Sequence, residues 1–277
     1  MIDVKGLRTR KGSDDWLELA INSNKDTVDQ LKELKPIIKF YYNKYEKLLR
    51  NQASEPQTSA VLAHSAILKS YYTSPPKDLG IQIKARREND ELSQCPFCGR
   101  PGYPRILDHF LPKNRWPEYS LLKNNLVNQC SACSSKKSES YFCIKNSSPK
   151  FIHPIYSSVL SKLELEFSIN IPNPLDIKQF EISLEIKIPP HYSVKTQKRV
   201  KLHIQSLEIR KYAIEHAERT YLEWIKKSLL RRVDILDMLK NNIILNEKLH
   251  NNDWTICLQK AMSQHPILIR HFEQHLP

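Results

Sequence analysis

The feature that most constrains this chain is a pair of C-x-x-C motifs, Cys95–Cys98 and Cys130–Cys133, with 31 residues between them. Zn²⁺ prefers thiolate ligands and closed four-coordination in structural sites, which two such motifs can supply. Gly99 follows the second cysteine and permits a tight turn that aims backbone amides at the sulfurs. Paired redox cysteines are the alternative, but neither pair lies in a thioredoxin-like strand–helix context. We therefore expect a small module folded around a structural zinc ion.

Length and composition indicate one large domain or two modest ones in a soluble protein. The chain has 277 residues, of which 40% are hydrophobic, and it shows no apolar run of 18 residues and no signal-peptide pattern. We expect a cytoplasmic protein without a membrane partner. In that compartment cysteines grouped in pairs favour metal binding over disulfides, and we expect the two remaining cysteines, Cys143 and Cys257, to be small buried hydrophobic residues.

The charge balance points to a polyanionic partner. The formal net charge is +13, and residues 91–150, which carry the cysteines, have the highest net positive charge per residue. Lys and Arg contacts to phosphates release counterions and dominate affinity for nucleic acids. The alternative is that the positive charge serves solubility.

The sequence pattern predicts an α+β fold in three parts. Residues 1–77 form a helical region, with a helix over 14–51 capped by Ser13 or Asp14 and broken or kinked at Pro36, and another over 59–72. The aromatic residues of this region fit helix packing, with base stacking as the alternative; they are Phe40, Tyr41, Tyr42 and Tyr45.

The second part, residues 78–150, changes to prolines, a Cys-Gly turn and short apolar runs, which predicts a knuckle, strand, loop, strand and helix. In the third part, residues 151–277, alternating patterns over 163–171 and 180–188 predict a strand hairpin. Helical periodicity follows over 193–240, with a break near Arg231, and more helix continues to the end. The histidines of this last stretch fit a helix surface; they are His265, His271 and His275.

The segment between the cysteine pairs resembles the HNH endonuclease family. It contains Asp108-His109, the run DHFLPKNRWPEYSLLKNNLV, and Asn125-Leu126 before Cys130. The family pattern is an Asp-His or His-His pair ending a first strand, an Asn before a Leu in a second, and a His or Asn starting a helix. The likeness covers about residues 95–137 and continues weakly to Phe151-Ile152-His153-Pro154. It implies a ββα-metal core with a structural zinc site.

The resemblance also implies a role for each residue. His109 is the general base that activates water, since imidazole titrates near the working pH. Asp108 holds a divalent ion, Mg²⁺ or Mn²⁺, that stabilises charge at the scissile phosphate. Asn125 bonds across the loop and holds the orientation of His109. The basic residues Lys113, Lys136 and Lys137 are candidates for phosphate contacts, the last two from the first turn of the helix, although a solvated helix face is equally compatible.

One position departs from the family pattern. Ser134 stands where a His or Asn completes the metal site, and a neutral hydroxyl is a poorer ligand than imidazole. Ser134 is then either a weak ligand or an N-cap residue. His153 is the candidate for a supplementary ligand.

Together these features predict a metal-dependent endonuclease that hydrolyses DNA, in a setting of phage defence or restriction and with an ATPase or another defence protein as a possible partner. RNA, including tRNA, is the alternative substrate. A zinc-stabilised nucleic-acid-binding protein with a weakened catalytic site is the alternative class.

Overall fold

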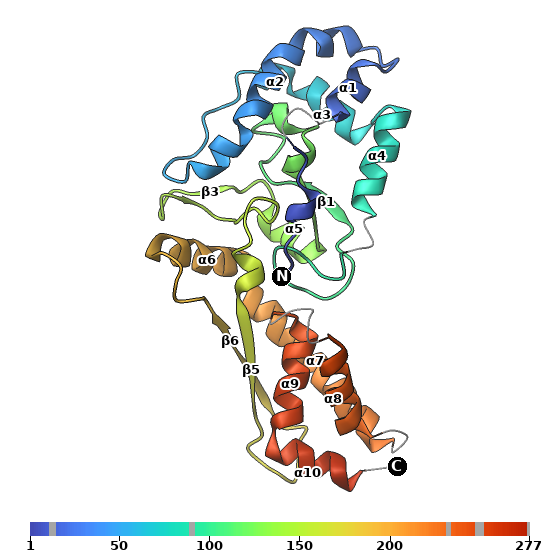
Figure 1. Ribbon diagram of the computed structural model, residues 1–277, viewed down its shortest axis with the longest axis vertical. Coiled ribbons are helices and arrows are strands. Elements are labelled where there is room, and N and C mark those ends of the chain that lie inside the picture. The colour runs from blue at the N-terminus through green and yellow to red at the C-terminus, as the bar shows by residue number, and fades with distance from the viewer. Residues whose placement is uncertain (11–14, 89–91, 231–233, 247–251, 276–277) are drawn as a thin grey trace. The chain divides into compact units, whose positions relative to one another are not determined.

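A computed structural model describes residues 1–10, 15–88, 92–230, 234–246 and 252–275 (Figure 1). The predicted mixture of helices and antiparallel strands is confirmed. The chain divides into two compact units, where three parts were predicted. The first, here the β1–β2 unit, comprises residues 3–97 and 102–158; the second, the β5–β6 unit, comprises residues 1–2, 98–101 and 159–277.

The described residues before β1 form four α-helices, which are α1 (Trp16–Ile21), α2 (Val28–Arg50), α3 (Ser65–Thr73) and α4 (Lys77–Arg87), and short 3-10 helices lie at Lys5–Leu7 and Leu62–His64. Of the predicted break or kink at Pro36, the break is wrong, because α2 runs through Pro36, while the kink stays a prediction. The interruption between helices lies between Ile21 and Val28. The polar stretch at 22–25, Asn-Ser-Asn-Lys, supplies the turn-forming side chains there. The predicted caps Ser13 and Asp14 lie outside the described residues.

Helix α4 was not predicted, because the part of the chain from residue 78 was expected to begin with a cysteine knuckle followed by a strand. Only two of its positions, Leu79 and Ile83, are buried apolar residues, so its helical period is short and weak. They are spaced four apart and therefore lie on one face of the helix.

The helices of this unit share a hydrophobic core with its first strand pair. Leu107, Leu121 and Leu126 belong to the same cluster of buried side chains as residues of α1 to α4. This shared core is the reason that the helical region and the β1–β2 strand pair form one unit. The helical contributors are Trp16, Leu17, Ala20, Ile21, Leu31, Ile38, Leu68, Tyr71, Leu79 and Ile83.

Two short antiparallel strands and a helix follow one another in the centre of the β1–β2 unit. Strand β1 (Ile106–His109) pairs with β2 (Leu126–Gln129), with His109 opposite Leu126 and Asp108 opposite Val127. Helix α5 (Ser131–Lys137) comes directly after β2. The predicted order of strand, loop, strand and helix is therefore present. A small hairpin of β3 (Phe142–Cys143) and β4 (Ser148–Pro149) ends the region.

The β5–β6 unit contains a longer hairpin, formed by β5 (Glu164–Asn170) and β6 (Glu181–Lys187), which confirms the strand pair predicted from alternation. Figure 1 shows this ribbon with helices alongside it, and α9 contacts β5 while α7 contacts β6. The helices are α6 (Val194–Ser206), α7 (Ile209–Leu229), α8 (Ile235–Asn246), α9 (Trp254–Gln264) and α10 (Pro266–Gln274). The predicted break near Arg231 lies outside the described residues.

Two of these helices begin at side chains suited to capping. Ser193 accepts a hydrogen bond from the amide of Thr196 at the start of α6. Asp253 accepts from the amides of Thr255 and Ile256 at the start of α9. Such caps satisfy amides that have no partner in the first helical turn.

No helix in the described ranges combines the length and apolarity needed to cross a membrane.

Candidate functional site

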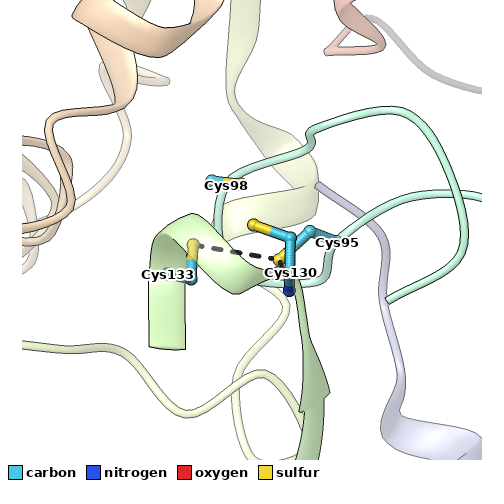
Figure 2. Close-up of side chains that lie close together, drawn as sticks. All are labelled: Cys95, Cys98, Cys130 and Cys133. Atoms are coloured by element: carbon cyan, nitrogen blue, oxygen red, sulfur yellow. Dashed lines mark hydrogen bonds between the residues drawn. The ribbon is translucent and has the colours of Figure 1, made fainter. Parts of the chain in front are cut away.

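The four cysteines of the C-x-x-C motifs lie together. Their sulfur atoms are all within 4.8 Å of one another, and those of Cys95 and Cys133 are 3.9 Å apart (Figure 2). Cys130 is the residue before α5, and Cys133 lies in its first turn. Three of the four are buried. A closed set of four thiol groups is the donor set that structural Zn²⁺ requires, so these residues fit the predicted zinc ion.

Backbone amides support the sulfurs as the sequence predicted. Gly99 has a φ of +79°, which suits a residue without a side chain. The turn that it permits lets the amide of Arg100 donate to the sulfur of Cys98 at 3.4 Å. The amide of Cys130 donates to the sulfur of Cys95 at the same distance. These donors stabilise negative charge on the sulfurs, which metal binding requires.

Asp108, near the end of β1, has a carboxylate held on one side. Its Oδ2 accepts hydrogen bonds from Gln129 Nε2 and from Lys137 Nζ, each at 2.8 Å. The Lys137 side chain is only 1% exposed, while that of Asp108 is 29% exposed. Gln129 and Lys137 were not predicted as partners of Asp108.

His109 is the last residue of β1 and is buried. Its Nε2 donates to the carbonyl of Ser120 at 3.0 Å, which leaves Nδ1 as the ring atom that can accept a proton. The ring of Tyr72 contacts it edge-on with centroids 4.4 Å apart. Burial lowers the pKa of His109 to about 4, so the imidazole is neutral at physiological pH.

Asn125 makes the bonds across the loop that were predicted. Its amide group donates to the carbonyls of Leu111 and Tyr119, both at 3.1 Å, and its oxygen accepts from the Leu111 amide and the Tyr45 hydroxyl, both at 2.8 Å. It thus closes the loop that follows His109. The His109 ring donates instead to the carbonyl of Ser120, a residue that was not predicted to take part.

The three lysines that were predicted to bind phosphates differ from one another in how far they are exposed to solvent. Lys137 lies in the last turn of α5, not the first, and is buried against Asp108, so its predicted contact with solvent phosphates is wrong. Lys136 is exposed. Lys113 is partly buried, with its ammonium 4.9 Å from the centroid of the Tyr72 ring, and burial lowers its pKa.

Ser134 is a helical residue inside α5 and not its N-cap. Its amide already donates to the carbonyl of Cys130 at 3.0 Å, because the capping position belongs to Cys130. Its side chain is partly buried.

His153 has no ring nitrogen left for a metal. Its Nδ1 accepts from the amide of Ile155 at 3.2 Å, and its Nε2 donates to the hydroxyl of Tyr45, also at 3.2 Å. Burial lowers its pKa to about 3. The prediction of a supplementary ligand is therefore wrong, because the ring joins Tyr45 to the loop after residue 152.

The predictions for the other two cysteines and for the aromatic residues of α2 are confirmed in part. Cys257 is buried as expected, but Cys143 is only partly buried and its thiol donates to Asn146 Oδ1 at 2.9 Å. Among the aromatic residues of α2, Tyr45 is buried in the core while Phe40 is 51% exposed beneath the ammonium of Lys44.

The comparisons with known proteins are limited. No family model and no solved structure matches the chain. A stretch of 61 residues is 38% identical to "Protein ea31" of Escherichia phage lambda; it covers 22% of this chain and 20% of that protein, so the chain matches about a fifth of its relative's length.

Proposed function

We propose that this protein is a metal-dependent HNH-type endonuclease that hydrolyses phosphodiester bonds, with DNA as the preferred substrate. The observation that carries the proposal is the Asp108-His109 pair at the end of β1, opposite Leu126 of β2 and followed by α5, with four clustered cysteines at both ends of this segment. Nucleic acid as substrate also fits the net charge of +13.

His109 has the properties of a general base. The bond from Nε2 to Ser120 fixes the tautomer and leaves Nδ1 without a proton. The lowered pKa keeps the imidazole neutral at physiological pH, and it also makes Nδ1 a weaker base than an ordinary imidazole until a substrate or metal ion changes its surroundings. The contact with Tyr72 holds the ring in place.

Asp108 has one carboxylate oxygen that fits a hard divalent ion. Mg²⁺ is commonly held by one or two carboxylates together with water and substrate phosphates. Among the described residues, the only cluster of three or more His, Cys, Asp or Glu ligands is the cysteine cluster, so Asp108 fits this sparse mode and not a full protein cage. When bound, such an ion stabilises negative charge at the phosphate.

The biological setting extends the proposal. The resemblance to HNH proteins of defence loci supports a role in phage defence or restriction, in the cytoplasm and beside an ATPase or another defence protein.

The test is cleavage by the zinc-loaded protein. Plasmid DNA, single-stranded DNA and total RNA are incubated with it in Mg²⁺, Mn²⁺ or EDTA. We expect metal-dependent cleavage, strongest on DNA, that His109→Ala abolishes and that His191→Ala, a change at an exposed histidine, leaves intact. Cleavage that persists in EDTA or in His109→Ala contradicts the mechanism.

A second candidate is a zinc-stabilised nucleic-acid-binding protein with a weakened catalytic site. Ser134 stands at the helix position of a family ligand, and the Asp108 carboxylate is already paired with a buried ammonium. If Ser134→His raises cleavage, the natural protein is a weakened enzyme. If neither protein cleaves any substrate while both bind DNA, binding is the function.

A further inference from the structure

The two oxygens of the Asp108 carboxylate have different surroundings. Oδ2 accepts two hydrogen bonds, from Gln129 and Lys137. Among the described residues, no hydrogen bond ends on Oδ1, and Oδ1 is not one of the buried side-chain atoms without a partner. It is therefore the oxygen that solvent and solutes can reach.

Both donors to Oδ2 are themselves fixed. Gln129 lies in β2 and is completely buried. Lys137 lies in α5, is equally inaccessible, and also donates from Nζ to the carbonyl of His109 at 2.5 Å. Two buried donors on one oxygen oppose rotation of the carboxylate, which keeps Oδ1 directed away from these donors.

The donors differ in charge although their distances are the same. Gln129 is a neutral amide, and Lys137 donates from Nζ to both Asp108 Oδ2 and the His109 carbonyl. Burial lowers the pKa of Lys137, and the adjacent Asp108 carboxylate opposes this shift by favouring the ammonium form. An ammonium adjacent to a carboxylate repels a second cation approaching the same group, and the repulsion is strong where water is partly excluded. Lys137 therefore both orients the Asp108 carboxylate and repels a cation bound to it, whereas Gln129 only orients the carboxylate.

We propose that Gln129 and Lys137 present Asp108 to a divalent cation through Oδ1 alone, and that the Lys137 ammonium weakens the binding of that cation. This rests on the proposed function in so far as the ion serves hydrolysis. Lys137 thereby makes the site depend on the substrate phosphate, whose negative charge offsets the ammonium and adds oxygen ligands. The protein holds the ion poorly alone and well with substrate.

The experiment measures Mn²⁺ affinity of the zinc-loaded full chain without nucleic acid, from the electron paramagnetic resonance signal of free Mn²⁺. Lys137→Gln removes the charge and keeps a donor, Lys137→Met removes both, and Gln129→Met removes the neutral donor. We expect both Lys137 variants to bind Mn²⁺ about tenfold more tightly, which corresponds to ~1.4 kcal/mol. We expect Gln129→Met to change the affinity by less than about threefold, well under 1.4 kcal/mol, and Asp108→Asn to remove the binding.

Circular dichroism and zinc content establish that each variant is folded. If Lys137→Met does not fold, the Mn²⁺ affinity of Lys137→Gln tests the inference. Unchanged or weaker Mn²⁺ binding in a folded Lys137 variant overturns the inference, as does equal tightening in Gln129→Met or an absence of binding in every variant.

Cleavage assays separate this inference from the proposed function. Tighter Mn²⁺ binding in the Lys137 variants, with no cleavage of any nucleic acid by the wild type, supports the assignment of Oδ1 and Lys137 while the nuclease proposal fails. Cleavage that depends on His109, with Mn²⁺ affinity indifferent to Lys137, overturns the inference alone.

Discussion

The two principal strand pairs of this protein are built in opposite ways. In β5 and β6 buried and exposed residues alternate along almost the whole length, and charged residues such as Glu166 and Lys187 pair on the exposed side. In β2 all four residues are buried, including the polar Asn128 and Gln129, and β1 carries Asp108 and His109. The longer pair follows the ordinary pattern of a one-sided sheet.

The difference indicates that the β1–β2 pair loses some folding stability because its polar side chains are held in fixed positions. Burying a polar group is unfavourable unless it is hydrogen-bonded. The β1–β2 pair and α5 nonetheless bury the imidazole of His109, the amides of Asn128 and Gln129, and the Lys137 side chain. Each of these groups has at least one partner, but the side-chain oxygens of Asn128 and Gln129 have none among the described residues. Such departures from pattern are expected where side chains must be held in one geometry.

The largest expected difference between the β1–β2 and β5–β6 strand pairs is their response to the loss of a zinc ligand. Structural zinc contributes about 10–16 kcal/mol in small zinc-binding peptides, which is comparable to the whole stability of a domain. We expect Cys95→Ser to lower the zinc content from about one ion per chain to near zero and to remove hydrogen-exchange protection from β1 and β2. Cys143→Ser, outside the cluster, is the control. Full zinc retention in Cys95→Ser is the contradictory result.

A cavity in the regular hairpin should reduce stability without affecting the site. Phe167 in β5 is 4% exposed, and Phe→Ala changes at buried positions cost about 3–5 kcal/mol. We expect Phe167→Ala to show that loss in urea unfolding with zinc content unchanged. Ser168→Ala, on the exposed face of the same strand, should stay within about 0.5 kcal/mol. A drop in zinc content on Phe167→Ala would falsify the separation of roles.

Removal of the buried amide at Asn125 should have a somewhat smaller effect. Four hydrogen bonds are lost and backbone groups of Leu111 and Tyr119 lose their partner, so we expect Asn125→Ala to cost about 3 kcal/mol. Tyr45→Phe removes one of these bonds together with the bond from His153 Nε2, and it should cost about 2 kcal/mol. Urea unfolding measures both. Equal losses in the two variants contradict this account of the loop.

Acid should destabilise the β1–β2 unit through His153. Its pKa is lowered to about 3 in the folded state, whereas an unfolded histidine has the ordinary value of 6.5. The unfolded chain therefore binds the proton first, and the free energy of unfolding falls as the pH drops below about 6.5. His153 contributes about 1.4 kcal/mol per pH unit to this fall, and buried His109, whose pKa is lowered to about 4, adds a similar contribution. Urea unfolding between pH 7 and 5 should show a shallower dependence in His153→Asn. An unchanged slope argues against a neutral buried imidazole.

Local patterns predicted the parts of this fold that depend on local spacing. The zinc cysteines, the turn at Gly99 and the β5–β6 hairpin follow from motifs or alternation within a few residues. The helix break was misplaced because Pro36 was weighted above the polar turn residues after Ile21, and one proline can be accommodated within a helix of 23 residues.

The site was predicted less completely because its contacts join distant segments. The bond between Tyr45 and Asn125 spans 80 residues, and that between Tyr45 and His153 spans 108. One signal was available: Lys137 follows Cys133 by four positions, which places both on the same face of α5. A lysine aligned with an inward-facing zinc ligand is expected to be buried. The nuclease assignment itself stays a prediction.

The shared core of α1 to α4 and the first strand pair has a consequence for synthesis of the chain on the ribosome. The early helices pack against Leu107, Leu121 and Leu126, and the guanidinium of Arg86 donates to the carbonyls of Leu7 and Leu126. Domains generally fold as units while the chain emerges. The N-terminal helices therefore have no complete partner until residue 126 has left the exit tunnel, and the nascent chain exposes their apolar faces to chaperones for that interval.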